Sequence, residues 1–208
     1  MFYTIEKNNE TKLIEKKSVF IANLYYIETE EDANLLIKKI EKKYYDAKNH
    51  CFAYRLQNNG DIIERFSDNG EPSGTAGQPI LGIIRGKQLT NVLIIVTRYF
   101  GGILLGTGGL VRAYSDSVKQ VLEDVQILKK DNGLKIMYEI QYNDLEKLKY
   151  YLRQNSIKIY KIEYFENIQI YVEIIHQKAE KIEKDKNELN FKILNMKIIE
   201  EKCAIIVE

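Results

Sequence analysis

The chain has 208 residues, of which 45% are hydrophobic and 29% charged, a balance typical of folded domains that excludes a largely disordered chain. Its 31 Lys and Arg residues against 30 Asp and Glu residues give a net charge of +1, which excludes binding to nucleic acid through bulk charge and leaves only a local cationic patch. No apolar run reaches the roughly 18 residues that span a bilayer, and Cys51 and Cys203 offer no disulfide framework, so we expect a cytoplasmic protein without a membrane contact.

The first elements are a strand and a well-signalled helix. Residues 18–27 are predicted to form the strand. Thr29 can cap the helix that follows, and acidic residues occupy the positively polarised first turn of that helix. Apolar residues then recur at helical spacing as far as Tyr44, which predicts one buried face.

A hairpin follows, and after it the composition changes sharply. Residues 51–57 and 62–66 flank a turn sequence at Asn59-Gly60, which predicts a β-hairpin. Residues 72–115 contain no Asp or Glu, both prolines and nine of the 12 glycines. The cations of this segment are Arg85, Lys87, Arg98 and Arg112. Such a local concentration predicts a functional or tightly packed region.

The same segment contains three further elements. Pro79 can open a short helix that runs to Ile84, because proline is tolerated at the first helical position. The apolar run 92–96 is typical of a strand buried on both faces. The glycine-rich stretch 101–109 then leads into a long helix that begins near Leu110.

The remainder of the chain predicts a second, smaller domain. A boundary near residues 129–133 would separate a domain of residues 1–130 from one of residues 131–208. The predicted order after it is β-α-β-β-α-β, a ferredoxin-like arrangement. Its elements are a strand at 134–142, a helix near 144–154 that Asn143 can cap, strands at 158–165 and 168–175, a helix near 177–188 and a last strand near 197–207. The expected class is therefore α/β (α+β), with two domains.

Three motifs in the N-terminal part resemble one family. NHCFAY, SDNGEPSGTAGQPIL and VTRYFGGILLGTGGLVRAYS occur in this order between Asn49 and Ser115, and the spacing of Ser18 and Phe20 extends the match. Together they resemble the IMPACT/YigZ family. The C-terminal segment is similar to the second domain of the bacterial members, so the resemblance covers nearly the whole chain.

The resemblance implies a fold and a field of function. The N-terminal domain should resemble the second domain of ribosomal protein S-five and domain IV of elongation factor G, and the C-terminal domain should resemble domain V of that factor. Eukaryotic relatives regulate translation and associate with ribosomes, but the kinase pathway on which they act is absent from bacteria. One departure is Asn69, which stands where the family usually has a second acid after Asp68, and it weakens any mechanism that needs two carboxylates.

The glycine-rich stretch is the first candidate site. Glycines allow a ligand to approach the backbone closely, and the free N–H groups at a helix start attract anions. Arg98 before the stretch and Arg112 after it can add cationic donors. The alternative is a tight strand-to-helix connection without a ligand; the spacing is not that of a P-loop. The contributing glycines are Gly101, Gly102, Gly106, Gly108 and Gly109.

Two further sets of residues are candidates of lower chemical specificity. One set includes acids and hydroxyls within eight positions: Asp68, Glu71, Ser73 and Thr75. The segment has no histidine to activate a hydroxyl. A binding or structural loop is therefore favoured over a catalytic one. His50 and its neighbour Cys51 should point to opposite faces of a strand, which excludes a catalytic pair and leaves His50 as a candidate site residue.

We therefore expect a regulatory protein associated with translation that binds RNA or the ribosome through a glycine-rich cationic cleft. No cofactor and no metal are expected, and a protein partner is possible. The alternatives are a hydrolase or transferase that acts on a phosphorylated small molecule, and a pure protein-interaction module. In the C-terminal sheet, Tyr171 is the lone aromatic predicted on the face opposite the core, where the charges are mixed.

Overall fold

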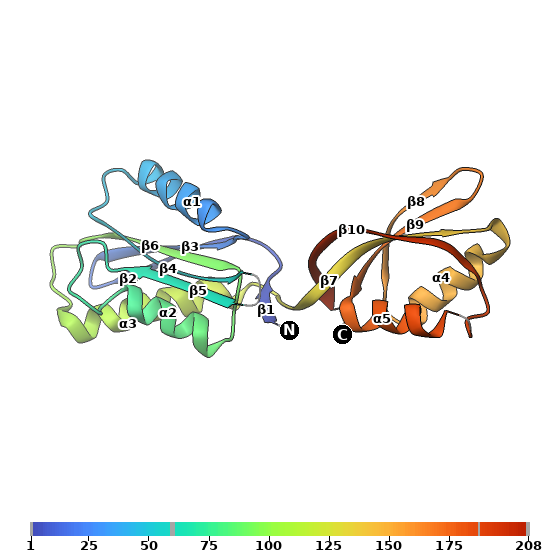
Figure 1. Cartoon of the computed structure of the whole chain (residues 1–208). Coiled ribbons are helices and arrows are strands. Elements are labelled where there is room, and N and C mark those ends of the chain that lie inside the picture. Colours follow the sequence, from blue (N-terminus) through green and yellow to red (C-terminus); the bar gives the residue numbers. More distant parts are fainter. Residues whose placement is uncertain (1, 59–60, 187, 207–208) are drawn as a thin grey trace. The chain divides into compact units, whose positions relative to one another are not determined.

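The computed structural model describes residues 2–58, 61–186 and 188–206. The chain divides into two compact units, residues 2–128 and residues 129–206. Figure 1 shows that each unit consists of an antiparallel sheet with helices packed against it. The predicted class, two mixed α/β domains, is therefore confirmed.

The N-terminal unit contains a five-stranded sheet in the order β2-β3-β6-β4-β5, and all neighbouring strands are antiparallel. Helix α1 lies on one face of the sheet, and helices α2 and α3 lie on the other (Figure 1). The elements are β1 (Phe2–Ile5), β2 (Asn9–Glu15), β3 (Ser18–Tyr26), α1 (Glu30–Lys43), β4 (Asn49–Asn58), β5 (Asp61–Ser67), α2 (Gly77–Gly86), β6 (Val92–Tyr99) and α3 (Gly106–Glu123).

Two of the predicted elements form for the expected reasons. Thr29 and Asp32 make a reciprocal capping box at the start of α1, in which each side chain accepts from the backbone N–H of the other residue. In β6, Ile94 contributes to the core under α2 and α3, while Leu93 and Ile95 contribute to the core under α1. The apolar run is therefore buried on both faces of the sheet, as predicted.

Other boundaries differ from the expectation. Helix α2 begins at Gly77 and ends at Gly86, two residues to either side of the range expected from Pro79. Strands β1 and β2 were not anticipated; β2 pairs with β3 along its whole length, and Thr90 N–H donates to the carbonyl of Tyr3 in β1. The expected turn at Asn59-Gly60 lies outside the described residues.

The C-terminal unit has the strand order β10-β7-β9-β8, with every neighbouring pair antiparallel, which is the order of the predicted ferredoxin-like arrangement. Both helices pack their apolar sides on one face of this sheet. The elements are β7 (Ile127–Ile140), a 3₁₀ turn (Tyr142–Asp144), α4 (Leu145–Gln154), β8 (Lys158–Tyr164), β9 (Ile168–Ile175), α5 (His176–Asp185) and β10 (Ile193–Ile206).

Local details of this unit depart from the predicted pattern. The 3₁₀ turn precedes α4, so that Asp144, not Asn143, is the residue before the helix. A register shift between Ile159 and Lys161 places Tyr160 beside Tyr171, with ring centroids 6.1 Å apart. Tyr171 is therefore not the lone aromatic there. Residues 187 and 207, within the predicted last helix and last strand, lie outside the described residues.

Candidate functional site

Three connections meet at one end of the N-terminal sheet, called here the loop end. They are the β2–β3 turn at Lys16 and Lys17, the loop of residues 68–76 before α2, and the loop of residues 100–105 between β6 and α3. Direct contacts hold them together. Gly101 N–H donates to Ser18 Oγ at 3.1 Å, and Arg98 at the end of β6 forms an ion pair with Glu71.

Asp68 organises the loop before α2. Its carboxylate accepts the N–H groups of Gly74, Ala76 and Gly77 at 2.9, 3.0 and 2.8 Å. The N–H groups of Ala76 and Gly77 are at the start of α2, whose own N-cap residue, Ala76, provides no side-chain acceptor. Asp68 thus caps α2 from outside the helix, and both of its oxygens are used in this structural role.

Glu71 lies in a buried polar network. Its Oε1 accepts from Arg98 Nη1 at 2.7 Å and from the Tyr114 hydroxyl at 3.0 Å. The Cys51 thiol lies 3.3 Å from the Tyr114 hydroxyl and 2.9 Å from the carbonyl of Asp68. Burial raises the pKa of Cys51 to about 12 and raises the pKa of Tyr114 as well, so both groups keep their protons near neutral pH. Neither group is activated as a nucleophile.

Arg98 occupies a different position from the one expected of a phosphate ligand. Its side chain is only 9% exposed, and its guanidinium lies close to the rings of Phe20 and Phe100, with centroid distances of 5.5 and 5.6 Å. The Nε of Arg98 has no hydrogen-bond partner among the described residues. The charge of Arg98 is thus paired with Glu71, and a direct contact between Arg98 and phosphate stays a prediction.

His50 lies on the other face of the sheet from Cys51, as expected for adjacent strand residues. Cys51 belongs to the core under α2 and α3, whereas the His50 ring Nδ1 lies 3.1 Å from Thr97 Oγ1. Burial lowers the pKa of His50 below its ordinary value. The backbone N–H of His50 donates to Asn69 Oδ1, so Asn69, at the position of the family's second acid, acts as a loop acceptor.

The glycines of the loop end differ in the space around them and in their backbone conformation. A Cβ at Gly101 would overlap the backbone of Lys17, so this glycine permits close packing of two connections. Gly102 and Gly106 have φ values of +81° and +71°, which favour glycine. Gly108 has open space around it. Gly109 would bring a Cβ against the Leu105 side chain.

The start of α3 has neither a cap nor an acid. Within the described part of the chain no side chain caps it, and its first turn contains no acidic residue. Gly106 and Gly108 are exposed there, as is Arg112 one turn further along the helix. Of the two hydroxyl candidates, Ser73 is exposed, whereas the buried Thr75 donates its hydroxyl to the carbonyl of Pro72.

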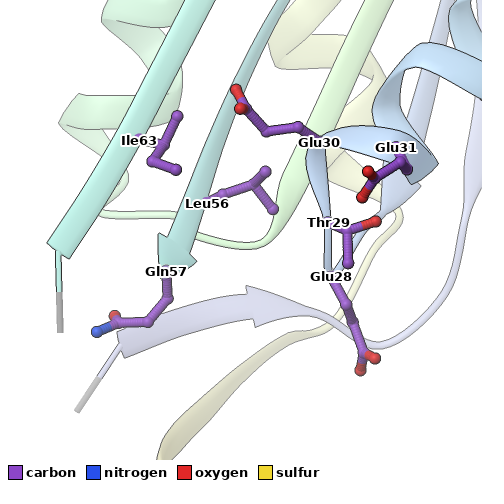
Figure 2. Close-up of a pocket in the computed structure, with 7 residues that line it drawn as sticks. All are labelled: Glu28, Thr29, Glu30, Glu31, Leu56, Gln57 and Ile63. Carbon is purple, nitrogen blue, oxygen red and sulfur yellow. The ribbon is translucent and has the colours of Figure 1, made fainter. Parts of the chain in front are cut away.

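A separate hollow of about 310 Å³ lies away from these residues. Figure 2 shows its two sides, the start of α1 and the ends of β4 and β5 that face each other in the hairpin. Glu30 in its wall accepts a hydrogen bond from the Tyr54 hydroxyl at 2.6 Å. The residues that line it are Glu28, Thr29, Glu30, Glu31, Leu56, Gln57 and Ile63. None of the predicted site residues is among them.

Comparison with known proteins agrees with the motifs at the loop end. A family model of the Impact N-terminal domain matches residues 16–122, and the Domain of unknown function (DUF1949) matches residues 139–185. The "IMPACT family member YvyE" of Bacillus subtilis is 38% identical over 175 residues, which cover 83% of this chain and 80% of that protein. The chain belongs to the IMPACT family.

Two further comparisons extend the likeness to other members. The "IMPACT family member YigZ" of Escherichia coli is 36% identical over 150 residues, covering 72% of this chain and 74% of that protein. A crystal structure described as that of a hypothetical protein has a TM-score of 0.63 and 29% identity, and covers 97% of this chain. Within the described residues, no helix has both the length and the apolar character to cross a membrane.

The IMPACT motifs therefore converge on one end of one sheet, but sequence reasoning missed several residues there. Lys16 and Lys17 were not identified, although both adopt left-handed backbone conformations, with φ values of 44° and 66°, in the turn that packs on Gly101. Phe100 was missed because it follows the strand directly. Its position two residues after Arg98 could have placed both side chains on one face.

Proposed function

We propose that this IMPACT family protein is a translation-associated regulator that binds the RNA phosphate backbone, as part of the ribosome or free, at its loop end. The observation that carries the proposal is the start of α3, where Gly106 and Gly108 are exposed and where, among the described residues, no side chain caps the helix and no acid lies in its first turn. The eukaryotic members of the family that this chain resembles regulate translation, and this resemblance supports the same proposal.

The helix start supplies an anion site on physical grounds. Four backbone N–H groups at a helix N-terminus lack partners within the helix, and the aligned peptide dipoles place about half a positive charge there. Arg112 lies four residues beyond Gly108, so the two share one face of α3, and helical side chains lean towards the N-terminus. A phosphate at this start would therefore meet both backbone donors and a guanidinium.

The charges around the site favour an anionic ligand. Asp68 and Glu71 are committed to the α2 cap and to Arg98. Lys16, Lys17 and Arg112 are exposed, and no ion pair of theirs is found within the described part of the chain. The loop end thus presents unpaired cations, although the net charge of the whole chain is only +1. Attraction of this kind is local and salt-dependent.

Gly108 offers a direct test. Because a side chain there would enter open space, Gly108→Asp can place a carboxylate at the anion site without a clash, and an acid in the first turn stabilises a helix. Gly108→Ala is the matched neutral control. We expect wild type and Gly108→Ala to co-sediment with ribosomes at low salt, and Gly108→Asp to remain in the supernatant with an unchanged or raised Tm.

Arg112→Ala should weaken pelleting and reduce its dependence on salt, because each lost phosphate contact lowers the number of released counterions by about one. Lys119→Ala removes a cation from the same helix, one that is paired with Asp116, and should have little effect. Wild type that fails to pellet at low salt would overturn the proposal. A screen of phosphorylated small molecules by thermal shift would then test whether the site holds a smaller anion.

A further inference from the structure

Phe100 lies against a buried arginine. The Arg98 guanidinium is 5.5 Å from the centroid of the Phe20 ring and 5.6 Å from that of the Phe100 ring, and the Phe20 ring meets the Tyr114 ring edge-on at 5.2 Å. Arg98 is fixed in turn by its 2.7 Å ion pair with Glu71. Cation–ring contacts of one guanidinium therefore connect Phe20 in the core with Phe100, the first residue of the β6–α3 loop.

The last ring of this stack is open to solvent. Phe100 is 52% exposed, although its neighbour two residues earlier, Arg98, is buried. A half-exposed ring that lies against a buried guanidinium leaves part of its surface free for a second flat group to stack on.

The surroundings of the ring indicate which flat group fits. Lys16, Lys17 and Arg112 bring unpaired positive charge to the loop end, and residues 72–115 contain no acid. Single-stranded nucleic acids are bound by this combination of cations for the backbone and an exposed aromatic ring for a base. From Phe100 to Leu105, the residue before α3, the chain spans at most about 20 Å, so a few nucleotides can reach from the ring to the helix start.

We propose that Phe100 is a stacking platform for an unpaired nucleobase of an RNA strand whose phosphates lie at the start of α3. This inference rests on the proposed function and specifies its ligand as single-stranded RNA. Bases in a duplex are stacked on one another and cannot reach the ring. The ring gives no sequence preference, because every base offers a flat face.

The protein contains no tryptophan, which makes the test sensitive. In Phe100→Trp, the only indole of the chain stands at the platform, and a base that stacks on it should quench its fluorescence. The probe is an oligoadenylate of about 12 nucleotides, a length within the usual site size of single-strand binders. We expect saturable quenching by the single strand and little quenching by an RNA duplex of equal length.

Affinity measured by fluorescence anisotropy of labelled oligoadenylate provides the second readout. Phe100→Leu keeps an apolar side chain but removes the flat ring, and should weaken binding roughly 10-fold to 100-fold. Phe100→Tyr should bind within a few-fold of wild type, which controls for the integrity of the loop. Leu104→Ser changes an apolar residue that is 83% exposed in the same loop and should leave the affinity unchanged.

The outcomes separate this inference from the proposed function. If Phe100→Leu binds as tightly as wild type while Gly108→Asp does not bind, the platform is refuted and the phosphate site stands. If Leu104→Ser weakens binding as much as Phe100→Leu, the loop makes a general apolar contact, and stacking is refuted. If wild type binds neither single-stranded nor ribosomal RNA at low salt, both proposals fail.

Discussion

The ion pair between Arg98 and Glu71 should determine the stability of the loop end. The two side chains are 9% and 5% exposed, so neither charge is well solvated when its partner is removed. Glu71→Gln deletes the negative charge but keeps an oxygen that can accept from Tyr114. Breaking a buried ion pair on one side costs about 3–5 kcal/mol of unfolding free energy. At roughly 2–4 °C per kcal/mol, the Tm should fall by roughly 6–20 °C.

Urea unfolding followed by circular dichroism measures this loss, and a double-mutant cycle assigns it to the pair. Arg98→Met removes the cation and retains a long side chain that can pack against Phe20 and Phe100. Glu71→Gln/Arg98→Met should therefore be more stable than the sum of the single losses implies, by at least about 1 kcal/mol. Asp116→Asn, which breaks the exposed pair with Lys119, should cost less than about 1 kcal/mol. A Glu71→Gln loss as small as that of Asp116→Asn, or strictly additive single losses, would refute the reasoning.

Two other changes test the packing of the same region. Gly101→Ala places a methyl group against the Lys17 backbone and should lower the free energy of unfolding in urea by about 1–3 kcal/mol. Gly108→Ala places its methyl group in open space and should not lower it. Equal losses for the two variants would contradict the close approach of Gly101 to Lys17. With Cys203 replaced by serine, the Cys51 thiol should react with iodoacetamide far more slowly at pH 8 than in denaturant, because burial raises its pKa to about 12. Rapid labelling of the native protein would show that the thiol is not buried.

The elements were largely predictable because they depend on neighbours in sequence. The capping box of α1 joins residues three apart, and the apolar run of β6 is continuous, so both are visible in a short window. The βαββαβ order of the C-terminal unit is confirmed for the same reason. That residues 1–130 and 131–208 fold as independent domains stays a prediction.

The site was less predictable, since its decisive contacts join residues that are distant in sequence. Glu71 stands one position before the acid-free segment begins, and only the fold brings it to Arg98, 27 residues later. A count of charges along the sequence therefore predicts an unpaired Arg98, whereas the structure pairs it with Glu71. The cap of α2 is similar: Asp68 acts from nine residues before Gly77, outside the range in which capping patterns are sought.

The position of β6 has a consequence for how the protein is made. β3 and β4 are not paired with each other; each pairs with β6, which is synthesised after both of them. During synthesis the early strands therefore present unpaired edges, and the sheet cannot close until residues 92–99 have emerged. The long sequence separation of these pairs also makes closure slow. Until β6 is made, the nascent chain therefore exposes strand edges that can pair with other chains.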